Sequence, residues 1–199
     1  MKIILAKSAG FCFGVRRAVE LTEQTAVKVA ESGGAAKVFT FGELIHNRDV
    51  VNRLREAGIA PIESLDEAQR GDYVIIRSHG VPKKIYEELE TRGINFIDAT
   101  CPFVSNIHRI VSAAYERGEQ VFIVGNPEHP ETIGINGHCG NSAIFIRGEE
   151  ELRKLEGRSG CLVVQTTFDS ETFAAMQRVI EREYPRIRVF NSICSTTFE

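Results

Sequence analysis

Three cysteines occupy similar places along the chain, about ninety residues apart: Cys12, Cys101 and Cys194. Each follows an apolar run that favours a β-strand, and the segments 14–19 and 103–107 after the first two favour helix starts. Thiols on strand-to-helix turns of repeated units can converge on one point. A helix N-terminus also lowers the pKa of a nearby thiol and favours the thiolate that binds metal. The spacing therefore predicts a metal-cluster site built from three thiolates.

Three histidines, His46, His79 and His129, each follow a predicted strand end, where ligands bind in α/β folds. A single histidine is more often a surface or satisfied core residue. Two of these three, however, come four residues after a glycine that ends an apolar run, Gly42 and Gly125. Imidazole and backbone donors can hold an anion through charge-assisted hydrogen bonds, so these histidines are candidate anion ligands.

Glu131, two residues after His129, is the best candidate for a general acid. A carboxyl group beside a buried cluster can keep a raised pKa and supply a proton. If no cluster lies beside it, simple solvation of a glutamate in a polar loop is the better interpretation. His108 and His138 have no repeated context, and His108 is expected on a helix face.

The repeat extends beyond the cysteines and histidines. Segment 71–78 resembles 160–167 at an offset of 89 positions, which is also the separation of Cys12 and Cys101. Self-similarity at a fixed period indicates repeated structural units. We expect one unit at 12–100, a second at 101–193, and remnants of a third at 1–11 and 194–199. Because a third unit needs roughly ninety more residues, the chain is expected to be a fragment, the product of a split gene or a truncated form of a longer protein.

Strand-like and helix-like segments alternate along the chain, which predicts an α/β fold with small parallel sheets. Pro82 and Pro102 suit first helical turns, and Gly93 and Gly118 suit helix ends. The expected strands are 38–41, 73–77, 94–97, 121–124, 161–165 and 187–190. The expected helices are 16–31, 81–92, 105–117 and 170–184.

Composition narrows the functional class. The 199 residues are 43% hydrophobic and 26% charged, as in ordinary globular proteins. A net charge of −3 without a basic stripe argues against nucleic acid as a partner. The absence of a long apolar run or a signal-peptide core argues against a membrane and predicts a cytoplasmic protein. The five cysteines are then expected to bind metal, react or be free rather than form disulfides; Cys139 and Cys161 lack the repeated context, and Cys161 is a predicted strand residue.

Together these motifs resemble those of the 4-hydroxy-3-methylbut-2-enyl diphosphate reductase family, also called LytB or IspH, in family order along the whole chain. The matching segments are 9–15 (Ala-Gly-Phe-Cys-Phe-Gly-Val), 42–47 (Gly-Glu-Leu-Ile-His-Asn), 77–81 (Arg-Ser-His-Gly-Val), 98–102 (Asp-Ala-Thr-Cys-Pro), 129–131 (His-Pro-Glu), 165–167 (Gln-Thr-Thr) and 193–197 (Ile-Cys-Ser-Thr-Thr). The resemblance implies three α/β domains in a pseudo-three-fold, trefoil-like arrangement around a central cluster. The third domain is largely absent from this sequence.

The resemblance also implies the ligands of the cofactor. Cys12, Cys101 and Cys194 would hold a [4Fe–4S] cluster that has one iron open to a substrate oxygen.

Roles for five further residues follow from the same resemblance. Glu131 would donate a proton, and Thr166 would hydrogen-bond the substrate hydroxyl group or its water. Three histidines would contact the substrate diphosphate: His46, His79 and His129.

The implied reaction is the last step of the non-mevalonate isoprenoid pathway. 4-Hydroxy-3-methylbut-2-enyl diphosphate is reductively dehydroxylated to isopentenyl and dimethylallyl diphosphates. Electrons would come from a ferredoxin or flavodoxin, since no nicotinamide-binding glycine fingerprint is evident. Because the family's third domain supplies further diphosphate ligands, we expect these 199 residues alone to have little activity.

Other functions are weighed against this one. Structural zinc is open, although zinc ligands usually come in close pairs, and the cysteine spacing is not that of ferredoxins. Quinolinate synthase and diphthamide-forming enzymes resemble the same three-fold arrangement but lack the His-Pro-Glu and Arg-Ser-His-Gly contexts. A cluster-binding redox or metal-sensing module without catalysis is the main alternative.

Overall fold

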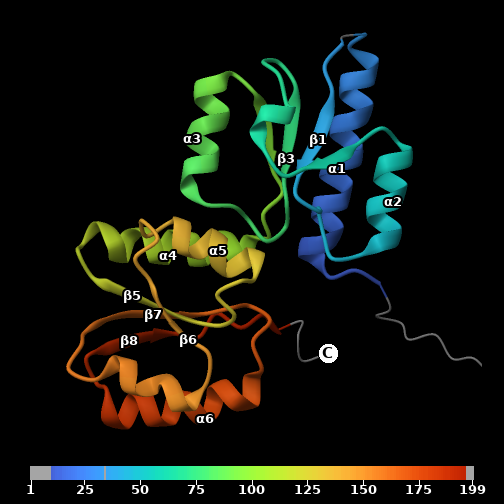
Figure 1. Ribbon diagram of the computed structural model, residues 1–199. Helices are drawn as coiled ribbons and strands as arrows, with labels where there is room; N and C mark the ends of the chain where they lie inside the picture. The colour runs from blue at the N-terminus through green and yellow to red at the C-terminus, as the bar shows by residue number, and fades with distance from the viewer. Residues whose placement is uncertain (1–9, 34, 196–199) are drawn as a thin grey trace, which may run out of the picture.

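The structure is a computed structural model that describes residues 10–33 and 35–195 (Figure 1). The apolar run before Cys12, at residues 3–6, and the Thr-Thr pair at 196–197 lie outside the described residues. In the described part of the chain, no helix combines the length and the apolar composition needed to cross a membrane.

The first half of the chain forms a four-stranded parallel sheet with the strand order β2-β1-β3-β4. Its elements are α1 (Phe13–Glu31), β1 (Val38–Phe41), α2 (Arg48–Glu56), β2 (Ala60–Ile62), the 3₁₀ helix η1 (Leu65–Glu67), β3 (Tyr73–Ile76), α3 (Lys83–Arg92) and β4 (Asn95–Asp98). Successive residues of β3 face opposite sides of the sheet. Ile75 packs with α1 and α2, while Val74 and Ile76 pack with α3 and η1.

The second half repeats this architecture, with the strand order β6-β5-β7-β8. Its elements are α4 (Pro102–Glu116), β5 (Gln120–Val124), α5 (Pro130–Gly137), β6 (Ile144–Ile146), the 3₁₀ helix η2 (Glu149–Leu155), β7 (Gly160–Val164), α6 (Ser170–Glu183) and β8 (Ile187–Phe190). Phe122 and Leu162 pack with α6, whereas Ile123 and Val163 pack with α4 and α5. The expected α/β class with parallel sheets is confirmed.

Helices α4 and α5 lie between the two sheets, so they cover the second sheet on the side that faces the first unit (Figure 1). The loop before α3 touches α5 at Gly137, where an added Cβ would lie 2.6 Å from the Cα atom of Pro82. Direct packing of backbone on backbone joins the two units, with no linker between them.

All six expected strands and four expected helices are present, with ends shifted by a few residues. Pro102 is in the first turn of α4, and Gly93 caps α3 in the left-handed conformation, as expected. Pro82 is the N-cap of α3 rather than a residue of its first turn. The short elements α2, α5, β2 and β6 were not predicted; β2 and β6 are three-residue edge strands.

Strand pairing corrects the offset of the internal repeat. The last residues of β1 and β5 each precede a glycine, and they pair with Ile76 in β3 and Val164 in β7. These two positions are 88 residues apart (164 minus 76), not 89. Arg77 is therefore the structural equivalent of Gln165, and Ser78 that of Thr166.

Candidate functional site

The three repeated cysteines stand at the carboxyl ends of the two sheets. Cys12 and Cys101 are the N-cap residues of α1 and α4, and Cys194 follows β8. The backbone N–H of Cys101 donates to the carbonyl of Ser78, and that of Cys194 donates to the carbonyl of Thr166, each at 2.9 Å. Both cysteine loops are thus anchored to the equivalent point on the neighbouring strand.

A second repeated feature shapes these two loops. Asp98 Oδ1 accepts a hydrogen bond from the N–H of Thr100 at 2.9 Å, and Asn191 Oδ1 accepts from the N–H of Ile193 at 3.2 Å. Such side-chain-to-backbone bonds two residues on mimic a turn. From α1, the Arg17 guanidinium donates to the carbonyl of Thr100 at 3.1 Å and fixes the residue just before a cysteine.

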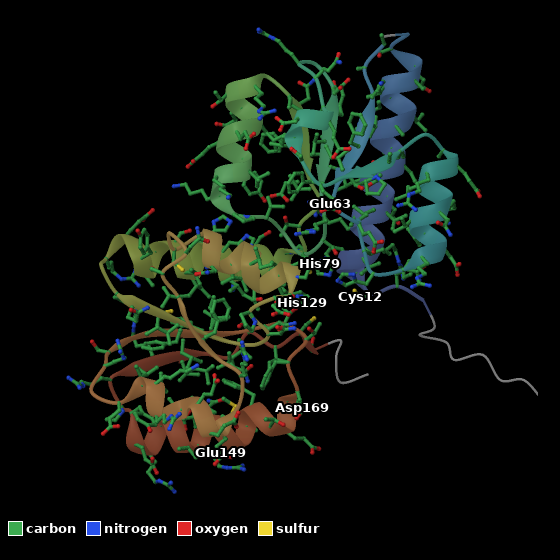
Figure 2. The ribbon with its side chains drawn as sticks, in the orientation of Figure 1. Cys12, Glu63, His79, His129, Glu149 and Asp169 are labelled. Carbon is green, nitrogen blue, oxygen red and sulfur yellow. The ribbon has the colours of Figure 1, made fainter. Side chains whose placement is uncertain are left out.

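The three cysteines line one cavity of about 270 Å³. It is lined by Cys12, Gly14, Val15, Ser78, His79, Cys101, Phe103, Val104, Glu131, Thr166, Thr167 and Cys194. At Gly14 an added Cβ would lie 2.6 Å from Cys101 Sγ, so this thiol rests against bare backbone. Figure 2 shows Cys12 with His79 and His129 at the junction of the two units.

The sequence prediction that the thiol pKa is lowered is wrong for Cys101. Burial raises the pKa of the Cys101 thiol, which outweighs the hydrogen bonds from the N–H groups of Phe103 and Val104. The nearby thiols of Cys194 and Cys12 raise this pKa further, because thiolates repel one another. Three thiolates that repel at one cavity suit a multivalent cationic group, which would relieve the repulsion and displace the thiol protons.

The three histidines form a compact cluster beside this cavity. The ring centroids of His46 and His79 are 4.5 Å apart, those of His79 and His129 5.5 Å, and those of His46 and His129 5.8 Å. One nitrogen of each ring lies within 4.8 Å of the others. The loop after β1, the loop after β3 and the N-terminus of α5 thus meet at one point, which joins the two units.

A capping interaction fixes the proton of His129. Its Nδ1 atom accepts a hydrogen bond from the N–H of Glu131 at 3.1 Å, and His129 is the N-cap of α5. In the neutral ring the proton is therefore on Nε2, which can donate to a ligand oxygen. Burial and the neighbouring charges of His46 and Arg77 lower the pKa of His129.

Arg77 and His79 carry polar atoms that the described residues leave unsatisfied. Arg77 Nε and His79 Nδ1 are buried without a hydrogen-bond partner in this part of the chain. Burial, then His46, His129 and Arg77, lower the pKa of His79 to about 3. By distance alone the cluster could hold a metal ion. The positive charge of the half-buried Arg77 opposes a cation there and favours an anion.

Glu131 is held by Thr166 on the opposite side of the cavity. Its two carboxyl oxygens accept from the N–H and the hydroxyl group of Thr166, both at 2.6 Å. The side chain is in the first turn of α5 and is 2% exposed, not in a solvated loop. Burial raises the pKa of Glu131, although the bonds from Thr166 act in the opposite direction.

The structure thus gathers all eight predicted site residues in one region. His79, Glu131, Thr166 and the three cysteines line the cavity, and His46 and His129 adjoin it through His79. Sequence reasoning gave no role to Arg77, although it lies in a quoted motif two residues before His79. Cys139 and Cys161 pack in the core of the second unit, the latter in β7 as expected.

A model of the LytB protein family matches residues 3–199. The chain belongs to the LytB family. A relative from Alkaliphilus oremlandii, named 4-hydroxy-3-methylbut-2-enyl diphosphate reductase, is 39% identical; the match covers 99% of this chain and 69% of the relative. A Clostridium perfringens protein of the same name is 45% identical, with 98% and 68% covered.

Solved structures of LytB-family reductases have the same fold. One described as the terminal enzyme of the non-mevalonate pathway matches with a TM-score of 0.84 and 40% identity, over 98% of this chain and 69% of that chain. A reductase from Plasmodium falciparum matches with a TM-score of 0.86 and 25% identity, over 96% and 60%. The likeness confirms the expected fold, of which two units are described here.

Proposed function

We propose that this protein is a 4-hydroxy-3-methylbut-2-enyl diphosphate reductase of the non-mevalonate isoprenoid pathway. The observation that carries the proposal is the meeting of three chemistries at one cavity. Three thiols and a buried carboxyl group line it, and a histidine cluster with the half-buried Arg77 adjoins it. A sensor would need the thiols alone.

The thiols of Cys12, Cys101 and Cys194 would hold an iron–sulfur cluster. Their convergence on one cavity, and the close approach of Gly14 to Cys101 Sγ, fit a compact inorganic group. With three protein ligands, a [4Fe–4S] cluster supplies electrons one at a time and one iron that can bind an oxygen atom.

The histidine cluster and Arg77 would bind the substrate diphosphate. His129 offers its Nε2 proton, and Arg77 and His79 offer buried polar atoms that find no partner among the described residues. Charge-assisted hydrogen bonds to a phosphate are among the strongest in proteins. They would fix the substrate so that its hydroxyl end reaches the thiol-lined cavity.

Glu131 would supply the proton that the leaving hydroxyl oxygen needs. Reductive removal of the hydroxyl group takes up two electrons and two protons and releases one water molecule. Because burial raises its pKa, Glu131 holds a proton at higher pH than an exposed glutamate does. Thr166 orients the carboxyl group through two hydrogen bonds and brings its own hydroxyl group to the same place. A ferredoxin or flavodoxin is the proposed electron donor.

The test is anaerobic reconstitution with iron and sulfide, followed by Mössbauer spectroscopy with and without substrate. We expect a cluster with one distinct iron site whose signal changes when the substrate alcohol is added. A cluster whose spectrum does not respond to substrate would favour the redox or metal-sensing alternative. Reconstituted Cys139→Ala protein is the matched control, since that thiol is outside the cavity.

Activity of the 199 residues alone is a separate prediction. The chain spans 69% of the Alkaliphilus relative that it matches. We expect little turnover from these residues by themselves with dithionite and a viologen as reductant. Turnover comparable to that of a full-length relative would contradict this prediction and leave the proposed chemistry intact.

A further inference from the structure

Two histidines outside the site, His108 and His138, form a stacked pair. Their ring centroids are 4.0 Å apart and their planes are inclined by 20°. His108 is in α4, and His138 is the C-cap of α5. Both belong to the second unit, on the side that faces the first.

The pair presses against the turn that follows His79 in the first unit. An added Cβ on Gly80 would overlap the Cε1 atom of His108 and lie 3.1 Å from its Nε2 atom. Gly80 has a left-handed φ of 71°, and its N–H bonds to the carbonyl of Arg77 at 3.0 Å. One residue further on, the carbonyl of Val81 lies 3.1 Å from His138 Nε2. Two imidazoles of one unit thus hold two consecutive residues of the other.

The imidazole of His108 is not needed for the packing of α4. The equivalent position in the first unit, seven residues after the cysteine, is Val19, which is a buried core residue of α1. His108 is also buried, and its Nε2 atom has no hydrogen-bond partner among the described residues. A buried polar atom without a partner destabilises a fold, so an apolar residue would serve stability better.

The His79 ring packs against His46 and His129, but no hydrogen bond at Nδ1 fixes its orientation within the described residues. The place of the ring therefore depends on the backbone of residues 78–81. His108 and His138 contact that backbone at Gly80 and Val81.

We propose that His108, stacked on His138, is a positioning residue that holds the Gly80 turn and thereby sets the place of His79 in the diphosphate-binding cluster. The inference rests on the proposed diphosphate-binding role of His79. A change at His108 would then weaken anion binding without touching the anion. Misplacement of a ligand group by about 1 Å is enough for a large loss.

The first experiment compares His108→Val with Val111→Ala. Both residues are buried in α4, but Val111 packs into the core of the second unit. Inorganic pyrophosphate is titrated into each folded protein by calorimetry, and Tm is measured separately. We expect His108→Val to bind on the order of tenfold more weakly and Val111→Ala to lose Tm at unchanged Kd. An unchanged Kd in His108→Val would overturn the inference.

Failure of the proposed function would look different. If wild type does not bind pyrophosphate, or if His79→Ala binds it as well as wild type does, the anion role of the cluster is wrong. The positioning role is then still tested by NMR of the histidine ring nitrogens, which needs no ligand. We expect the His79 signals to move in His108→Val and to stay in place in Val111→Ala; immobile His79 signals in both would overturn the inference.

A double-mutant cycle tests the contact itself. Gly80→Ala introduces both backbone strain and overlap with His108, whereas only the overlap depends on the imidazole. The loss of Tm caused by Gly80→Ala should therefore be smaller in the His108→Val background than in wild type. Equal losses of Tm in the two backgrounds would show that residue 80 and His108 do not contact each other.

Discussion

The two α/β units have the same backbone plan but different chemistry at the ends of their strands. Both have the same strand order, an N-cap cysteine and the Asp/Asn turn before the next cysteine. At equivalent positions after β3 and β7, the first unit has Arg77 and the second has Gln165. The repeat fixes where side chains gather, and a few substitutions decide what they do there.

The difference lies in how each unit satisfies its polar groups. Gln165 accepts from the N–H of Asn126 and donates to the hydroxyl group of Thr167, each at 3.0 Å. Arg77 Nε and His79 Nδ1 are buried without a partner among the described residues. Buried polar atoms in native proteins are nearly always paired. At this place the second unit therefore satisfies its polar groups internally, whereas in the first unit we propose that a ligand satisfies them.

The largest expected effect tests the repeated cysteines, which both units have. Cys101→Ala should abolish formation of a specific cluster, because two thiolates are too few to replace the ligand set of the three-cysteine site. Iron and sulfide analysis after anaerobic reconstitution measures this. Cys161→Ala removes a buried thiol of β7 and should keep the iron content at some cost in stability. Equal iron content in wild type and Cys101→Ala would break the proposed equivalence of the cysteines.

The next largest effect is expected at Glu131, the proposed proton donor of the second unit. Glu131→Gln keeps an oxygen to accept from the N–H of Thr166 but cannot donate a carboxyl proton. In a full-length protein that carries this sequence, we expect turnover to fall by about 100-fold or more, with little change in pyrophosphate affinity. In wild type, turnover should fall as pH rises through the raised pKa of Glu131, because only the protonated form is the acid. A full rate in Glu131→Gln would assign the proton to another group.

Arg77→Gln gives the first unit the residue of the second. Burial lowers the pKa of Arg77, so its charge is held at a cost to folding. We expect pyrophosphate affinity to drop about tenfold or more, since a charge-assisted bond is worth roughly 1.5–3 kcal/mol. Stability to urea should stay the same or rise. If affinity is unchanged, Arg77 does not give the first unit a different role in anion binding.

Two glycines of α5 probe the contact between the units. At Gly137 an added Cβ would lie 2.6 Å from Pro82 Cα, whereas at Gly134 the nearest atom, the Gly80 carbonyl carbon, is 3.4 Å away. Gly137→Ala should cost about 1–3 kcal/mol of unfolding free energy through overpacking. Gly134→Ala should stabilise by up to about 1 kcal/mol through helix propensity. Equal effects in urea unfolding would mean that the backbones do not meet there.

The last expected effect is a dependence of stability on pH. Burial, then the stacked His138, lower the pKa of His108 to about 3 in the folded protein. The unfolded chain takes up a proton below pH 6.5 and the folded protein does not. Stability should therefore decline as pH falls from 6.5 towards 3, by up to about 1.4 kcal/mol per pH unit. In His108→Val, which carries the valine of the first unit, this slope should shrink; identical slopes would show that His108 does not titrate in this way.

The sequence was sufficient for the sheets because their inner strands are continuous apolar runs such as Val74 to Ile76, buried on both faces. The edge strands β2 and β6 lack that signal, since each has three residues and a mixed burial pattern. Helix α5 was missed because its apolar face spans little more than two turns. For the same reason a polar loop stayed open as the alternative for Glu131, although Pro130 before it is typical of a first helical turn.

The repeat marked part of the site, and the family resemblance supplied His79, Glu131 and Thr166. The cysteines and two histidines recur in matching contexts, whereas Arg77 differs from its counterpart and so drew no attention. Its equivalence to Gln165 depends on strand register, which the apparent offset of 89 obscured. The predicted direction of the Cys101 pKa shift was wrong because desolvation raises this pKa by more than the helix terminus lowers it. Desolvation depends on the packing of α1 against α4, which the sequence does not show.

Cys101 belongs to both units at once, since it closes the loop after β4 and also caps α4. A group bound to the Cys101 thiol would therefore be attached to the end of the first unit and to the start of the second through one bond. Loss of that group would loosen the joint as well as the chemistry.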